Sequence, residues 1–238
     1  MKLSERLLNV ASLVSSDGIL ADIGTDHGYI PIYLVQQGKI RGAIASDVNM
    51  GPLNRALENV KLYNLQEYIS LRLSNGLEKY SLGEVSSIVM AGMGADLMMD
   101  IIKRGEDICH EVSEIILQPQ SNAAQFRLFL TNEGYKITDE KIVLEDGKYY
   151  PMMRVYFKGI PSTIKHELSE DEYFGKLLLD RKDHILKDYL MKEIIINDNI
   201  TNKLKANLNT KNSASKSRYE EVTKYRNFID KALARFEE

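Results

Sequence analysis

Two acidic residues and two glycines alternate within the segment 22–28, as Asp22, Gly24, Asp26 and Gly28. The segment follows an apolar run and precedes a stretch of helical character, which predicts a turn from a strand into a helix. Glycine makes such a turn tight and lets a ligand approach the backbone closely. An acidic turn repels a pyrophosphate and attracts a ligand that carries positive charge. The pattern therefore favours binding of a cationic ligand, with an ordinary turn as the alternative.

A third carboxylate, Asp47, follows the next apolar run and lies 23 residues after Gly24. An acid at about this spacing accepts hydrogen bonds from ribose hydroxyls in folds that bind nucleotides or adenosyl cofactors. S-adenosylmethionine combines a ribose with an amino group and a sulfonium. We therefore expect this cofactor, although Asp47 is also suited to capping the helix that follows.

Three further loops follow predicted strands and carry small or amide residues. In the first, Asn75 and Gly76 place a side-chain amide where it can recognise adenine. In the second, Gly92 lets the backbone approach a ligand. In the third, Gln118 and Pro119 are expected to line a pocket for a substrate base. The carboxyl ends of parallel strands meet at one edge of a sheet, so these loops are expected to form one site.

The elements that position these loops alternate between strands and helices up to about residue 134. Strands are predicted at 19–23, 42–46, 69–73, 87–90, 114–117, 135–144 and 152–158, and helices at 30–37, 52–63, 95–104 and 123–133. Such alternation is typical of an α/β fold with a mostly parallel sheet. The last two strands are separated by about seven residues that resemble a hairpin turn, so the sheet is expected to end in an antiparallel pair.

The C-terminal part has a different composition, because only one of the 15 glycines lies beyond residue 160. Apolar residues recur there at helical spacing, in a first group of Phe174, Leu178, Ile185, Tyr189, Ile196, Ile200, Leu204 and Leu208, and a second of Tyr219, Val222, Ile229, Leu233 and Phe236. Two helices with a short connection favour an antiparallel hairpin. An intermolecular coiled coil is the alternative.

Composition narrows the class of protein. The chain has 238 residues, 44% hydrophobic and 27% charged, which excludes disordered, collagen-like and disulfide-rich classes. Its single cysteine, Cys109, indicates a reducing compartment, and without a run of about 18 apolar residues no membrane helix is expected. We therefore expect a cytoplasmic protein. The four histidines lack the spacing of metal ligands, so no metal is expected.

The segment 22–28, together with 91–94 (AGMG) and 117–120 (LQPQ), resembles the bacterial tRNA (adenine-22-N1)-methyltransferases. The segments 3–7 and 146–152 are similar to that family as well, and the resemblance covers essentially the whole chain. It implies a Rossmann-like class I methyltransferase domain over residues 1–160 and a coiled-coil-like helical domain over 161–238. It also implies S-adenosylmethionine as methyl donor and N1 of adenine 22 in tRNA as acceptor.

The expected site follows from the residues and the resemblance together. The cofactor-binding residues are predicted to be Asp22, Gly24, Asp26, His27, Gly28, Asp47, Asn75, Gly76 and Gly92, and the substrate-binding residues Tyr29, Gln118, Pro119 and Arg127. Attack of a ring nitrogen on a methyl group needs alignment more than deprotonation, and its first product is cationic. A nearby carboxylate would stabilise that charge, and Asp26 is the candidate for this catalytic role.

The net charge of −3 argues weakly against a nucleic-acid partner, but its distribution matters more. Basic residues gather in the C-terminal part, at Lys203, Lys205, Lys211, Lys216, Arg218, Lys224 and Arg226. A helical hairpin with such a tip is suited to tRNA phosphates, and we expect the chain to act as a monomer. Two alternatives remain, a methyltransferase of a small molecule or protein and a non-catalytic module that binds an adenosyl nucleotide.

Overall fold

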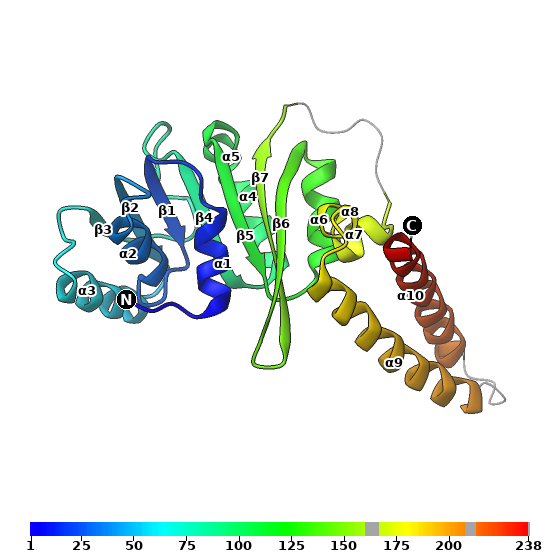
Figure 1. Cartoon of the computed structure of the whole chain (residues 1–238). Coiled ribbons are helices and arrows are strands. Elements are labelled where there is room, and N and C mark those ends of the chain that lie inside the picture. The colour runs from blue at the N-terminus through cyan, green and yellow to red at the C-terminus, as the bar shows by residue number, and fades with distance from the viewer. Residues whose placement is uncertain (160–166, 208–212, 238) are drawn as a thin grey trace. The chain divides into compact units, whose positions relative to one another are not determined.

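The computed structural model describes residues 1–159, 167–207 and 213–237 and divides the chain into two compact units, Met1–His166 and Glu167–Glu238 (Figure 1). The expected boundary between residues 160 and 161 lies outside the described residues, as does Lys211 of the basic tip.

The first unit contains one seven-stranded sheet in the order β3-β2-β1-β4-β5-β7-β6. Its strands are β1 (Ile19–Ile23), β2 (Gly42–Asp47), β3 (Ile69–Leu73), β4 (Ser87–Met93), β5 (Glu114–Pro119), β6 (Tyr135–Glu145) and β7 (Lys148–Phe157). Strands β1 to β5 pair in parallel, and β7 runs antiparallel to both β5 and β6. The predicted Rossmann-like sheet with an antiparallel terminal hairpin is confirmed.

Helices cover both faces of this sheet, because alternate residues of its buried strands point to opposite sides. Three helices, α1 (Glu5–Leu13), α2 (Tyr29–Gln36) and α3 (Met50–Leu62), pack on the face that carries Leu20 and Val89. The helices α4 (Ala95–Arg104), α5 (Glu106–Glu111) and α6 (Ala123–Asn132) pack on the face that carries Ala21 and Ile88. Two apolar layers thus fix the strand ends from which the site is built.

The terminal hairpin is tighter than expected. Asp146 and Gly147 form its turn with φ angles of 50° and 75°. Two consecutive positive φ angles suit the primed two-residue turns, whose twist matches that of the flanking strands. The seventh strand therefore begins at Lys148 and not at residue 152. The prediction failed there because Pro151 interrupts the pattern, whereas in the structure it lies within β7 opposite Ile142.

The described residues of the second unit form four helices, α7 (Glu170–Phe174), α8 (Lys176–Asp180), α9 (His184–Asn207) and α10 (Ser213–Glu237). The long helices α9 and α10 pack against each other and form the predicted hairpin (Figure 1). The spacing of the first apolar group predicts one continuous helix, and this prediction is wrong. Gly175, with a φ of 89°, separates α7 from α8. Among the described residues of α9 the buried positions are Leu186, Leu190 and Asn197, while Ile196 is 41% exposed.

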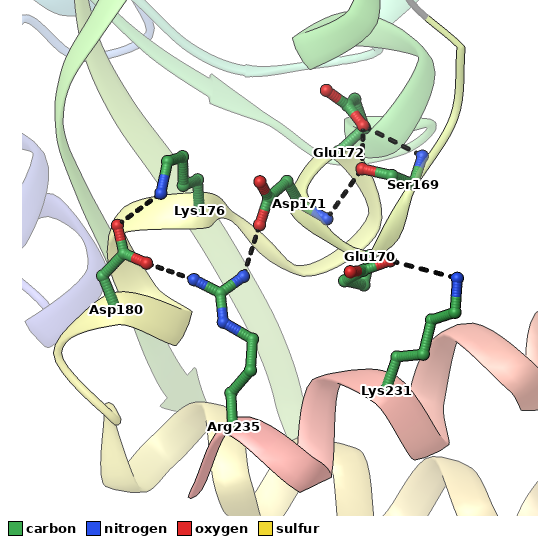
Figure 2. A network of polar contacts seen from close by, with 8 residues as sticks. All are labelled: Ser169, Glu170, Asp171, Glu172, Lys176, Asp180, Lys231 and Arg235. Carbon is green, nitrogen blue, oxygen red and sulfur yellow. Dashed lines mark hydrogen bonds and ion pairs between the residues drawn. The ribbon is translucent and has the colours of Figure 1, made fainter. Parts of the chain in front are cut away.

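A polar network joins α7 and α8 to the last turns of α10 (Figure 2). The guanidinium of Arg235 pairs with the carboxylates of Asp171 and Asp180, and Lys176 pairs with Asp180 at 2.8 Å. The side chain of Ser169 caps α7 in a reciprocal capping box with Glu172. These contacts lie within the second unit and hold its short helices against the hairpin.

Candidate functional site

Two adjoining cavities open at the carboxyl ends of β1, β2 and β4. The larger has a volume of about 350 Å³ and the smaller about 230 Å³. They share a wall made of Gly24, Ala91 and Gly92. In the strand order, β1 lies between β2 and β4, so successive connections leave it in opposite directions. This is the topological switch point at which open α/β sheets bind ligands.

The turn after β1 forms part of that shared wall. The amides of Gly24 and Thr25 both donate to the carbonyl oxygen of Ser46 at 2.8 Å, which ties the turn to the neighbouring strand. Gly24 has a φ of 73°, and a Cβ at this position would lie 2.6 Å from Cε of Met93. The positive φ favours glycine at this position, and a side chain here would also require the flexible end of Met93 to shift.

The carboxylate of Asp22 lines the larger cavity at the end of β1. The residue is only 6% exposed, and burial raises the pKa of its carboxyl group from 3.8 to about 6. The hydroxyl of Thr25 lies beside the carboxylate and opposes this rise of the pKa, but its contact falls short of regular hydrogen-bond geometry. The negative charge of Asp47 adds to the rise. A cation bound in the cavity would stabilise the ionised form of Asp22.

The smaller cavity combines two polar groups with apolar walls. Asp47 ends β2 there, and its Oδ1 accepts a hydrogen bond from the amide of Asn49 at 2.7 Å. Asn75 and Gly76 come from the loop after β3, and Asn75 Nδ2 donates to Glu78 Oε1 at 2.8 Å. The apolar part of the lining is Ile23, Val48, Met93, Leu97 and Ile101. A carboxylate beside an apolar slot suits a ribose with its attached base.

The larger cavity has an aromatic and acidic side formed by the turn before α2. The rings of His27 and Tyr29 stack with centroids 5.0 Å apart and planes 10° apart. The carboxylate of Asp26 accepts from Arg55 Nη2 at 2.6 Å and lies 3.6 Å from His27 Nε2. His27 has a φ of 69°, and its carbonyl accepts from Asn59 Nδ2 at 2.9 Å. The predicted Asp26, His27 and Tyr29 are thus brought together.

Four predicted site residues line neither of the two cavities, so their roles in binding stay predictions. Gly28 lines neither cavity, because its missing side chain makes room for Ala56 of α3, 3.4 Å from a Cβ built there. Gln118 and Pro119 are buried within β5 and line neither cavity. Arg127 is only 3% exposed, and its Nε lies 2.7 Å from Glu140 Oε1 in a buried ion pair between α6 and β6.

Two polar residues outside the predicted set of cofactor-binding and substrate-binding residues, Arg6 and Gln120, line the larger cavity. Gln120, rather than Gln118, lines it from the position just after the end of β5. Arg6 reaches the same cavity from the first turn of α1. The sequence signals for Arg6 were the resemblance of residues 3–7 to the methyltransferase family and its positive charge, which suits tRNA phosphates. Arg6 lies far in sequence from the glycine-containing loops, so the pattern of those loops did not place it in the site.

Metal binding and membrane insertion are considered next. Among the described residues, no group of three or more His, Cys, Asp or Glu side chains is arranged to bind a metal ion. Within the described ranges, no helix has the length and apolarity needed to cross a membrane.

The site matches the chemistry of S-adenosylmethionine. The cofactor's adenosine needs an apolar slot with an acceptor for the ribose, which the smaller cavity offers through Asp47. Its amino group and sulfonium need negative charge, which Asp22 supplies in the larger cavity. The buried hydroxyl of Thr25 has no hydrogen-bond partner of regular geometry in the described structure, and it stands beside Asp22. The small residues of the shared wall allow one ligand to extend through both cavities.

Comparison with known proteins agrees with this chemistry. Residues 3–153 match the family model for a methyltransferase domain. The chain is 40% identical over 153 residues to the tRNA (adenine(22)-N(1))-methyltransferase of Bacillus subtilis, an alignment that spans 64% of each protein.

Two solved structures match nearly the whole chain. The crystal structure of the B. subtilis m1A22 tRNA methyltransferase TrmK superposes with a TM-score of 0.84 and 30% identity, covering 98% of this chain and 99% of that one. The structure of M. capricolum TrmK, in complex with S-adenosyl-homocysteine, gives a TM-score of 0.81 and 32% identity with the same coverage.

Proposed function

Because the chain belongs to the tRNA (adenine-22-N1)-methyltransferase family, we propose that it transfers a methyl group from S-adenosylmethionine to N1 of adenine 22 in tRNA. The observation that carries this proposal is the pair of adjoining cavities at the ends of β1, β2 and β4, with acids where a cationic adenosyl cofactor needs them. When bound, the cofactor supplies an electrophilic methyl group.

The chain's own residues would bind and orient that cofactor. The carboxylate of Asp47 accepts from the ribose hydroxyls, and the amide of Asn75 is placed to contact the adenine edge in the smaller cavity. Asp22 accepts from the amino group, and the pKa of its carboxyl group falls when that cation is bound. Gly24 and Gly92 leave the space through which the ligand crosses from one cavity to the other.

The acceptor side of the larger cavity would hold the adenine. The stacked rings of His27 and Tyr29 present a π surface of the kind on which an extracted base stacks. N1 of adenine has a lone pair, so the protein needs to align it and not to remove a proton. Asp26 is proposed to stabilise the positive charge that develops on the base. Its ion pair with Arg55 lowers the net field that it exerts.

A methyl-transfer assay tests the proposed function. Labelled S-adenosylmethionine is incubated with the full chain and unmodified tRNA, and the digested product is analysed for N1-methyladenosine. A tRNA with guanine in place of adenine 22 is the matched control. Transfer to the first tRNA and not to the second is expected. Equal transfer to both tRNAs, or transfer to neither, contradicts the proposal.

The helical unit is proposed to contact tRNA phosphates. The exposed cations of the described hairpin include Lys205 and Lys216 as well as Lys203 and Lys224. Arg226 is less suited than expected, because it pairs with both Asp198 and Asp230.

We propose that the protein works in the cytoplasm, because that is where bacterial enzymes act on tRNA. The first unit contains both cavities, so a monomer suffices.

Replacing Lys203 and Lys205 together by alanine tests this contact. Each lost phosphate contact weakens tRNA binding and lowers the dependence of log K on log salt by about one unit, so the double variant should lose about two. The control variant replaces Lys39 and Lys61, which are exposed near the amino ends of β2 and β3. An unchanged salt dependence in the Lys203 and Lys205 variant, or an equal loss in the control, would contradict a role of the hairpin.

A further inference from the structure

The side chain of Arg6 is held in the larger cavity from several sides. Its Nη1 donates to Gln118 Oε1 at 2.8 Å, and its Nε lies 3.8 Å from Glu145 Oε2. Its guanidinium also lies over the ring of Tyr150, 5.5 Å from the centroid. The backbone amide of Arg6 donates to Glu145 Oε1 at 3.0 Å. The helix α1 and the hairpin β6–β7 thus fix one guanidinium in a defined place.

Most of the donors of this guanidinium remain available to a ligand. Arginine has five N–H donors, and among the described residues Arg6 uses only Nη1 in a side-chain hydrogen bond. The side chain is 21% exposed, so it is oriented toward the cavity and partly shielded from water. A guanidinium that is fixed and only partly satisfied in this way is suited to binding a planar anion such as a carboxylate.

The place at which that anion would bind is marked by Gly92. A Cβ built on Gly92 would lie 3.9 Å from Nη1 of Arg6 and 3.7 Å from Nε2 of Gln120. Both nitrogen donors therefore border the small space that the missing side chain leaves. Gly92 has a φ of 84° and belongs to the wall shared by the two cavities, so this space adjoins the path of a ligand that crosses between them.

The larger cavity carries opposite charges on two of its lining residues, Asp22 and Arg6. An amino acid has an α-ammonium group and an α-carboxylate, and the two residues complement this pair. We propose that Arg6, assisted by Gln120, binds the carboxylate of the cofactor's methionine moiety, while Asp22 binds its ammonium group. This inference deepens the proposed function and rests on the binding of an adenosyl cofactor.

A tRNA phosphate is the rival ligand for Arg6. Its partial burial, its contact with the acid Glu145 and its position beside the shared wall favour a ligand inside the cavity over a backbone phosphate at the surface. The two ligands predict different results for a binding measurement made without tRNA.

Calorimetric titration of the full chain with two ligands separates them. One ligand is S-adenosyl-homocysteine, and the other is its decarboxylated form, which keeps the adenosine, the thioether and the amine. The proteins are the natural chain, Arg6→Gln, Arg6→Lys and the control Arg41→Gln, whose exposed side chain lies at the amino end of β2. Thermal unfolding of each variant checks that it is folded.

The natural chain is expected to bind the decarboxylated ligand about 10- to 100-fold more weakly, the range for a charge-assisted hydrogen bond. Arg6→Gln should bind S-adenosyl-homocysteine more weakly by about the same factor and should barely discriminate between the ligands. Arg6→Lys should retain part of the discrimination, and Arg41→Gln all of it. Equal losses for both ligands in Arg6→Gln, or unchanged affinity for both, would overturn the inference. If the natural chain bound neither ligand, the proposed function itself would fail.

Discussion

Replacing Asp22 by asparagine is expected to stabilise the ligand-free protein while weakening cofactor binding. Burial raises the pKa of the Asp22 carboxyl group from 3.8 to about 6. The folded state therefore binds this proton more tightly than the unfolded chain does. The resulting stabilisation is complete below pH 3.8 and is lost as the pH rises through about 6. Above that pH the buried, ionised carboxylate destabilises the folded state.

The size of this effect follows from the shift of the pKa. At about 1.4 kcal/mol per pKa unit, ionised Asp22 costs the folded state about 3 kcal/mol. A neutral asparagine avoids that cost, but its buried amide needs hydrogen bonds of its own and retains part of the penalty. The variant should therefore be more stable than the natural chain by about 1–3 kcal/mol at pH 7.5. Near pH 4 this advantage should almost disappear.

Differential scanning calorimetry of the ligand-free proteins at pH 4.0 and pH 7.5 measures the difference. The relevant transition is the one that S-adenosyl-homocysteine shifts upward in the natural chain, because it reports the first unit. At about 2–4 °C per kcal/mol, Asp22→Asn should melt about 2–12 °C higher at pH 7.5.

The matched control is Asp26→Asn, which lies in the same turn, is 58% exposed at its side chain and loses an ion pair with Arg55, so no gain is expected. A gap between Asp22→Asn and the natural chain that does not change with pH would refute the reasoning.

Two further substitutions separate binding from folding. Asp47→Ala should weaken S-adenosyl-homocysteine binding at least 10-fold, because it removes charge-assisted hydrogen bonds to the ribose, while the melting temperature should change little. Calorimetric titration measures the affinity and thermal unfolding the melting temperature. An unchanged affinity would contradict the role of Asp47 in binding the ribose. Arg127→Ala should destabilise the first unit by about 3–5 kcal/mol because it leaves Glu140 charged and buried, whereas the exposed Arg104→Ala should cost less than about 1 kcal/mol. Equal melting temperatures for the two arginine variants would refute this account of Arg127.

The parallel part of the fold was predictable because its signals are local. Each of the first five strands is a short apolar run, and each predicted helix begins or ends within two residues of the observed one. The short helix α5 was missed, since Gly105 both ends α4 and begins α5 within one turn. Pro151 and Gly175 show the converse error. Whether a proline interrupts a strand, or a single glycine interrupts a helix, depends on neighbours that are distant in sequence.

The site was predictable where an acidic residue and a glycine occur in the same loop after a strand. Asp22, Gly24 and Asp47 all line the cavities, as their place at the carboxyl ends of buried strands predicts. Arg127 was predicted to bind substrate as a basic residue near the sheet-end loops, and its residue type gave no indication that it is buried. The structure pairs it with Glu140, an acid 13 positions later in the chain and on another element. No local pattern identifies such a pair, since its partners meet only after the sheet has formed.

Arg6 extends the same reasoning to the organisation of the site. The residues that sequence reasoning found come from loops between β1 and α4, whereas Arg6 depends on Gln118 from β5 and on Glu145 from β6. The antiparallel hairpin therefore does more than complete the sheet, because it orients a cation toward the wall that both cavities share. A change at Glu145 should then alter ligand discrimination through Arg6 without touching the ligand. This couples the edge of the sheet to the cavity at its centre.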